Sequence, residues 1–219
     1  KFFIQKAIFL SMNNRPGPVW IDVPIDFLGK TIFEKNLKHF YFDKSQNEMK
    51  FQNISKKISK VYKLINNSKK PVILVGYGIN YKRAKNKVID LVNKLNIPIL
   101  TSRRGSDLIH HNHKFYFGRP GVYGNRYSNF IIQKCDLFIS IGSRLSIPLI
   151  GRNTESFAKN AIKIVVDVDE NELEKKTIKP DFPINFSADE FINQMINYKT
   201  SNIKKFGTWI RICKEFKNQ

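Results

Sequence analysis

Residues 69–80 read KKPVILVGYGIN, and this stretch decides the fold. The apolar run at residues 71–75 is too short for a helix and rich in β-branched side chains, so it predicts a strand buried on both faces. Gly76 and Gly78 form a turn directly after it, and residues 81–95 have the apolar spacing of a helix. Strand, glycine-containing turn and helix open a doubly wound α/β sheet, whose ligands bind at the carboxyl edge of the strands.

The glycine turn departs from the dinucleotide-binding fingerprint. That fingerprint requires a third glycine at position 81, which is Tyr81 in this chain. The helix that follows carries only Asp90, and no acidic residue ends a second strand at the place where a ribose hydroxyl needs one. We therefore interpret the turn as a tight connection between a strand and a helix, and we do not expect classical NAD binding.

Strands and helices alternate along the rest of the chain. The pattern predicts further strands at residues 97–101, 136–142, 162–169 and 183–186, and helices at residues 51–66, 127–134, 189–198 and 203–216. This alternation predicts the α/β class, with a parallel Rossmann-like sheet and helices on both faces. The chain begins with a predicted helix at residues 2–12 and a predicted strand at residues 19–23, which we interpret as the end of a preceding domain.

The amino-acid composition predicts one sizeable core and argues against nucleic-acid binding. The 219 residues are 42% hydrophobic and include 18 Phe, which is enough for one sizeable core. Lys and Arg number 38 against 18 Asp and Glu, a formal net charge of +20. The lysines are spread over every segment instead of forming one basic stripe, so we do not expect nucleic-acid binding. A basic nucleic-acid binder remains an alternative that steeply salt-dependent DNA binding would favour.

The cysteine content and the hydropathy of the chain bear on its cellular location. Cys135 and Cys213 are the only cysteines and lie far apart in the sequence, so we expect neither a disulfide framework nor a thiolate metal site. A reducing, cytoplasmic location is the simpler expectation. No apolar run approaches the length of a membrane span, so no membrane association is expected. The chain does not begin with Met, and we expect it to be a fragment of a longer protein.

Arginines and glycines follow the predicted strands at the edge where ligands bind in such sheets. Arginine side chains and backbone N–H groups at this edge suit a phosphate or another anion, although the arginines could instead form surface ion pairs. A carboxylate at the end of the fourth predicted strand could take a ribose hydroxyl or shape the following turn. The candidate cofactor-binding residues are Gly76, Gly78, Arg103, Arg119, Gly121, Gly142, Ser143, Arg144 and Asp167.

Asp169 opens a predicted helix whose first turns are acidic, so helix capping is sufficient to explain an aspartate at this position. His110, His111 and His113 lie in a polar loop without a third ligand at fixed spacing, so we expect no metal site. The chain contains no nucleophile elbow, no P-loop and no carboxylate pair beside a histidine. We expect no catalytic residue within it.

Several blocks together resemble thiamine-diphosphate enzymes of the acetolactate synthase type. RPGPVWIDVPID at residues 15–26 resembles the end of their pyrimidine-binding domain, and residues 69–80 resemble the first strand and turn of their central domain. Residues 118–146, GRPGVYGNRYSNFIIQKCDLFISIGSRLS, and residues 162–191 resemble the later parts of that central domain. WIRICKEFK at residues 209–217 is similar to the helix that leads to the diphosphate-binding domain.

The resemblance implies a division of the chain and a function. It implies a tail of the pyrimidine-binding domain at 1–30, a linker at 31–50, a central Rossmann-like domain at 51–199 and a connecting helix at 200–219. It also implies a 2-oxo acid decarboxylase or carboligase that is homo-oligomeric, acts on a small-molecule 2-oxo acid and uses thiamine diphosphate and Mg²⁺. The activating glutamate and the GDG…N cofactor motif of the family are not in these residues, so the cofactor is expected to bind outside them.

Some members of the family hold FAD or an ADP-containing ligand in the central domain. Flavin-binding relatives commonly have GMHG where this chain has Gly118-Arg119-Pro120-Gly121, and this departure argues against FAD. Acidic residues and an aromatic are also missing after Arg144. The alternative from another class is a stand-alone α/β module that binds an adenine nucleotide, FAD or CoA without catalysis.

Overall fold

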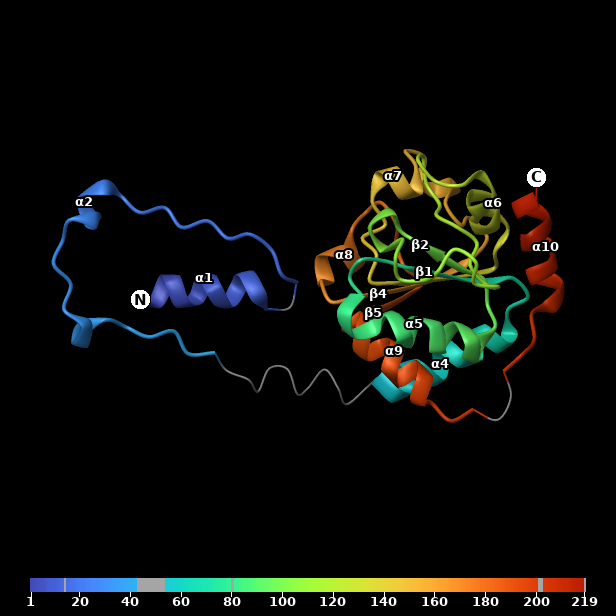
Figure 1. Ribbon diagram of the computed structural model, residues 1–219, viewed down its shortest axis with the longest axis horizontal. Helices are drawn as coiled ribbons and strands as arrows, with labels where there is room; N and C mark the ends of the chain where they lie inside the picture. The colour runs from blue at the N-terminus through green and yellow to red at the C-terminus, as the bar shows by residue number, and fades with distance from the viewer. Residues whose placement is uncertain (14, 43–53, 80, 201–202, 219) are drawn as a thin grey trace. The chain divides into compact units, whose positions relative to one another are not determined.

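The computed structural model describes residues 1–13, 15–42, 54–79, 81–200 and 203–218 (Figure 1). The chain divides into two compact units, Lys1–Phe51 and Gln52–Gln219.

The smaller unit consists of α1 (Phe2–Met12), α2 (Ile25–Leu28), the 3₁₀ turn η1 (Glu34–Asn36) and irregular connections. A later segment folds back on α1, because the N–H of Phe40 donates to the side chain of Gln5 and the Phe9 ring lies 4.2 Å from the ring of Phe42. Among its described apolar side chains only Ala7 is buried, and Trp20 is 91% exposed. The unit therefore has almost no core of its own.

The predicted helix at residues 2–12 is confirmed, but the predicted strand at residues 19–23 is wrong. That segment is irregular, and all five strands of the sheet lie between Pro71 and Asn185. A strand exists only when its backbone pairs with another strand. Among the described residues of the smaller unit no segment pairs with it, so its β-branched composition alone does not produce a strand.

The larger unit is a doubly wound α/β domain. Its elements are, in chain order, α4 (Ile54–Asn67), β1 (Pro71–Val75), α5 (Tyr81–Leu95), β2 (Ile99–Thr101), η2 (Arg103–Gly105), α6 (Arg126–Lys134), β3 (Leu137–Ile141), α7 (Ile147–Ile150), η3 (Thr154–Ser156), β4 (Ile162–Asp167), α8 (Glu170–Glu174), β5 (Phe182–Asn185), α9 (Ala188–Asn197) and α10 (Gly207–Asn218). The five strands form one parallel sheet in the order β2-β1-β3-β4-β5. The predicted fold class is confirmed.

Helices cover both faces of this sheet. In Figure 1, α4, α5 and α9 form a layer below the strands, and α9 contacts both of the other helices. The apolar spacing that predicted α4 is confirmed, because its buried residues recur every three or four positions from Ile54 to Ile65. Lys94 of α5 stabilises the end of α9, since its ammonium group donates to the carbonyl oxygens of Ile196 and Tyr198 at 2.6 and 2.7 Å.

The last helix is anchored to the first strand and to the opposite layer. The indole N–H of Trp209 donates to the carbonyl oxygen of Pro71 at 2.9 Å, and the Trp209 side chain is buried. The ring of Phe216 lies 6.0 Å from the ring of Phe130, where α10 packs against α6. Helix α10 therefore belongs to the packed structure of the larger unit.

Two buried serines give a matched test of this core. The Ser128 hydroxyl donates to the carbonyl oxygen of Phe117 at 2.5 Å, whereas the Ser140 hydroxyl on β3 has no hydrogen-bond partner among the described residues. Replacing an unpaired buried hydroxyl removes a desolvation cost, but removing one member of a buried pair leaves its acceptor unsatisfied. Ser140→Ala should not lower the free energy of unfolding, and Ser128→Ala should lower it by about 1–3 kcal/mol. Urea unfolding of both variants checks this, and equal losses would contradict it.

Candidate functional site at the carboxyl edge of the sheet

The strand order fixes where a ligand crevice is expected. From β1 the chain first adds β2 on one side of the sheet and then returns to add β3 on the other side. In sheets of this order the connections after these two strands leave in opposite directions, and ligands bind in the opening between them. The turn after β1 contains Gly76 and Gly78, and the turn after β3 contains Gly142 and Ser143. The structure brings these four predicted residues together.

Backbone contact closes that opening. The N–H of Gly76 donates to the carbonyl oxygen of Ile141 at 2.9 Å, and the N–H of Gly78 donates to that of Gly142 at 2.8 Å. A Cβ atom on Gly76 would lie 2.6 Å from the Cα atom of Ser143, and one on Gly78 would lie 2.8 Å from the carbonyl oxygen of Gly142. The expectation that these N–H groups are open to a ligand is therefore wrong. The glycines are needed for direct packing between two turns, which we call the glycine interlock (Gly76, Gly78 and Gly142).

Arg144 extends from the interlock towards α8. Its Nε atom lies 2.8 Å from a carboxylate oxygen of Glu172, although 71% of the Arg144 side chain is exposed. Lys175 binds the other carboxylate oxygen at 2.9 Å and also donates to the carbonyl oxygen of Arg144. The structure thus shows the ion pair that the sequence left open as an alternative to ligand binding.

The two acidic residues after β4 shape the chain locally. A carboxylate oxygen of the buried Asp167 accepts from the N–H of Asp169 at 3.0 Å. Asp169 is the N-cap of α8, where its carboxylate accepts from the N–H of Asn171 at 3.0 Å. The predicted capping role of Asp169 is confirmed, and the bond at Asp167 holds the turn between the strand and this cap.

Arg119 and Gly121 lie in a turn at residues 118–124 that is fixed by two asparagines. Asn125 accepts from the N–H of Arg119 at 3.0 Å, and Asn129 both accepts from and donates to the backbone of Gly121, at 2.8 and 3.2 Å. Gly121 has a φ of 108°, a conformation that favours glycine. Sequence reasoning missed both asparagines, and the available signal was amide side chains a few residues after a glycine-rich turn.

Arg103 and its neighbour Arg104 form most of η2, which follows β2 at the same edge. The guanidinium group of Arg103 lies 5.8 Å from the ring centroid of Tyr123, and that of Arg104 lies 4.2 Å from the ring centroid of Tyr77. Sequence reasoning missed both tyrosines. Arg103 therefore lies near the turn that carries Arg119 and Gly121. Arg144 instead forms its ion pair with Glu172 on α8.

Other candidate chemistry is not assembled in the parts of the chain that the structure describes. No three His, Cys, Asp or Glu side chains there lie close enough to hold a metal ion. Burial raises the pKa of Cys135 to about 12 and also raises that of Cys213, so neither thiol is a nucleophile at neutral pH. None of the described helices is both long and apolar enough to cross a bilayer.

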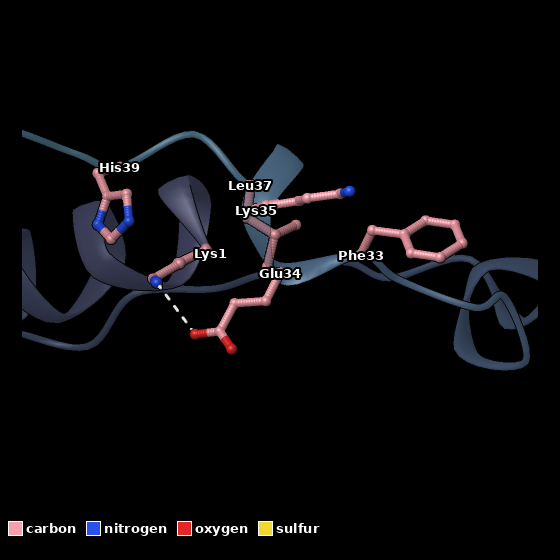
Figure 2. A pocket seen from close by; sticks show the side chains of 6 residues that line it. All are labelled: Lys1, Phe33, Glu34, Lys35, Leu37 and His39. Carbon is pink, nitrogen blue, oxygen red and sulfur yellow. Dashed lines mark ion pairs between the residues drawn. The ribbon is translucent and has the colours of Figure 1, made fainter.

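The smaller unit has a shallow hollow on its surface. Figure 2 shows Lys1 and Glu34 pointing towards each other in it, with 3.7 Å between the ammonium nitrogen and a carboxylate oxygen, and Phe33 pointing away. Glu34 is largely exposed to solvent, so this ion pair contributes little to the stability of the fold. The hollow brings together no group of side chains with a chemical role.

The described residues do not fit either implied cofactor. Thiamine diphosphate is held through a divalent cation, and no three His, Cys, Asp or Glu side chains of the described residues lie close enough together to hold one. FAD or ADP at the expected crevice would need open N–H groups for its phosphates, but those of Gly76, Gly78 and Gly142 donate to Ile141, Gly142 and Val166. A nucleotide pyrophosphate therefore has no place within the glycine interlock.

The fold is a parallel α/β domain in which the turns after β1 and β3 are in direct backbone contact. Residues 58–195, more than half of the chain, match the family model of the thiamine pyrophosphate enzyme central domain, and the chain belongs to that family. The predicted family is thus confirmed.

Known proteins with similar sequences support the same family. The chain is 30% identical over 210 residues to the acetolactate synthase large subunit of Porphyra purpurea, covering 93% of this chain and 34% of that protein. It is 33% identical over 201 residues to a probable acetolactate synthase large subunit of Methanococcus aeolicus, covering 88% and 32%. For the acetolactate synthase large subunit of Lactococcus lactis the values are 28% over 213 residues, 95% and 35%. The chain spans about a third of the length of these relatives.

A single methyl group tests whether the interlock is closed. In Gly76→Ala the new Cβ would meet the backbone at Gly142 and Ser143, which cannot rotate away as a side chain can. This variant should lower the free energy of unfolding by about 3 kcal/mol, the upper end of the usual overpacking range. Gly207→Ala is the matched control, because nothing lies within 4 Å of its added Cβ. Urea unfolding that found the two variants equally stable would contradict the closed interlock.

Proposed function

We propose that the chain is the central part of a thiamine-diphosphate-dependent 2-oxo acid decarboxylase or carboligase of the acetolactate synthase type. The observation that carries the proposal is the match of residues 58–195 to the central domain of this family, on a parallel sheet of the corresponding α/β class. Relatives named as acetolactate synthase large subunits align with 80 to 97% of the chain and support the same function. When bound, thiamine diphosphate supplies the carbanion chemistry on the 2-oxo acid, and protein groups position it.

The remaining parts of the proposal concern the protein around this domain. Residues 1–30 would be the end of the pyrimidine-binding domain, 31–50 a linker, 51–199 the central domain and 200–219 the helix towards the diphosphate-binding domain. The nearly coreless smaller unit supports the first of these, because its apolar side chains need a larger domain to cover them. We further propose Mg²⁺ as the cofactor's metal, a homo-oligomer and a cytoplasmic location, the last supported by two free, buried cysteines.

Within such an enzyme, the central domain would act as a rigid spacer between catalytic domains. The closed glycine interlock supports this role, because the N–H groups of Gly76, Gly78 and Gly142 are already bonded to other backbone groups. The same observation disfavours the alternative of a stand-alone module for an adenine nucleotide, FAD or CoA. Gly76, Gly78, Gly142, Ser143 and Asp167 would then serve the fold.

Activity and cofactor binding test the proposed function. The 219-residue chain should neither bind thiamine diphosphate with Mg²⁺ in a calorimetric titration nor decarboxylate pyruvate, because the family's activating glutamate and GDG…N motif are not in these residues. The complete protein encoded with this chain should do both, and each activity should depend on added cofactor. Micromolar binding by the 219-residue chain would place the cofactor here and contradict the proposed division. A complete protein inert towards a panel of 2-oxo acids would contradict the function.

The same preparation of the complete protein tests the spacer role. Its visible spectrum should lack a flavin band, because the interlock leaves no room for a pyrophosphate between β1 and β3. A flavin band near one equivalent per chain would contradict the spacer role while leaving the enzymatic proposal intact.

A further inference from the structure

Cys135 and Cys213, which are far apart in the sequence, lie in the same contact between two helices. Cys135 is the C-cap residue of α6 and Cys213 belongs to α10, and these helices pack against each other. Both residues are buried, with 2% and 0% of their surfaces exposed. They are the only cysteines of the 219 residues. The fold therefore brings together two thiols that no local sequence pattern pairs.

One face of α10 carries Cys213 between two aromatic anchors. Trp209, Cys213 and Phe216 recur at intervals of four and three residues, so they share one face of the helix. The buried Trp209 side chain donates its N–H to the carbonyl oxygen of Pro71 at 2.9 Å. The ring of Phe216 lies 6.0 Å from the ring of Phe130 on α6. Cys213 thus lies between these two contacts on the face that meets the domain.

The chain that enters β3 passes the same two contacts in the reverse order. It leaves the contact at Phe130, reaches Cys135 and continues to Leu137, which pairs with Pro71 in the sheet. Cys135 therefore lies opposite Cys213. The electrostatics agree, because the pKa of Cys213 is raised by burial and in addition by the charge of a Cys135 thiolate, which acts only when the two sulfurs are close.

We infer that Cys135 and Cys213 form a reversible disulfide that locks α10 onto the start of β3. The bond would replace the weak hydrogen bond from the Cys135 thiol to the carbonyl oxygen of Ile132 at 3.0 Å. In the packed form both thiols are buried and protonated, so they do not react there. The reaction therefore begins when α10 moves away from α6 and exposes them. This inference goes beyond the proposed enzymatic function and does not rest on it.

The oxidant in this step is a small-molecule disulfide. One exposed cysteine thiolate attacks a sulfur of the oxidant and expels the first small thiolate, leaving a mixed disulfide on the protein. The second cysteine thiolate attacks the protein sulfur of that mixed disulfide and expels the second small thiolate. The two cysteines are oxidised, the oxidant is reduced, and the two protons lost by the cysteines are taken up by the two released thiols. Excess small thiol reverses the reaction.

Equilibration of the 219-residue chain with mixtures of glutathione and glutathione disulfide tests the inference. Because only two cysteines are present, an internal disulfide lowers the mass of the monomer by two hydrogen atoms and leaves no thiol for iodoacetamide. The equilibrium constant for closing this bond should be about tenfold or more larger in the folded chain than in urea, since packing holds the sulfurs together. Equal constants, or mixed disulfides with no internal bond, would overturn the inference.

Urea unfolding of the closed chain is an independent check. A bond that forms more readily in the folded chain must also favour the folded chain, so the closed form should unfold at a higher urea concentration than the reduced form. A lower midpoint for the closed form would show that the bond distorts the packing of α10, and it would contradict the inference. Cys213→Ser is the control, because it should form only a mixed disulfide with glutathione.

A variant of α10 tests the opening step. Trp209→Phe keeps an aromatic ring and removes the N–H that bonds to Pro71, so α10 should open more often and the disulfide should form several-fold faster. Asn218→Ala is the matched control, an exposed neutral residue of the same helix, and it should react at the original rate. Equal rates for both variants would overturn the opening step. Circular dichroism of each variant checks that its fold is retained.

Discussion

Direct backbone packing between the turns after β1 and β3 is the constraint on which the rest of the sheet's carboxyl edge depends. Gly76 and Gly78 donate their N–H groups to Ile141 and Gly142, and a side chain at either glycine would collide with the opposing backbone. These strands are buried at every position, and the turns that follow them are joined by direct backbone hydrogen bonds. Glycine is required here for close approach, which is a structural role that resembles a ligand-binding pattern in the sequence.

Because backbone contact closes the centre of the sheet's carboxyl edge, the charged and aromatic side chains at this edge lie around that centre. Arg144 is drawn to Glu172 on α8, and Asp167 holds the turn before the α8 cap. The side chains left facing solvent at the edge are those of η2 and of two constrained turns, including Arg103, Tyr77 and Tyr123.

The sequence predicted the features that depend on neighbouring residues, and it failed for those that depend on residues far apart in the chain. The buried run at residues 71–75 and the apolar spacing of α4 were sufficient to predict a strand and a helix, because burial on a parallel strand or a helix face leaves a local pattern. The strand at residues 19–23 failed because pairing depends on a distant partner. The candidate site was placed at the correct edge, but the bond from Arg144 to Glu172 joins residues 28 apart, and no local pattern reveals it.

Amide hydrogen exchange at Gly76 and Gly78 tests the closed interlock most directly. Both amides should exchange slowly without any ligand, because each N–H is already bonded to a carbonyl oxygen across the two turns. The amide of Gly207, in the first turn of α10 where helical N–H groups lack intrahelical acceptors, is a fast-exchanging reference. Exchange at Gly76 and Gly78 as fast as at Gly207, slowing only when FAD or ADP is added, would show an open crevice and contradict this account.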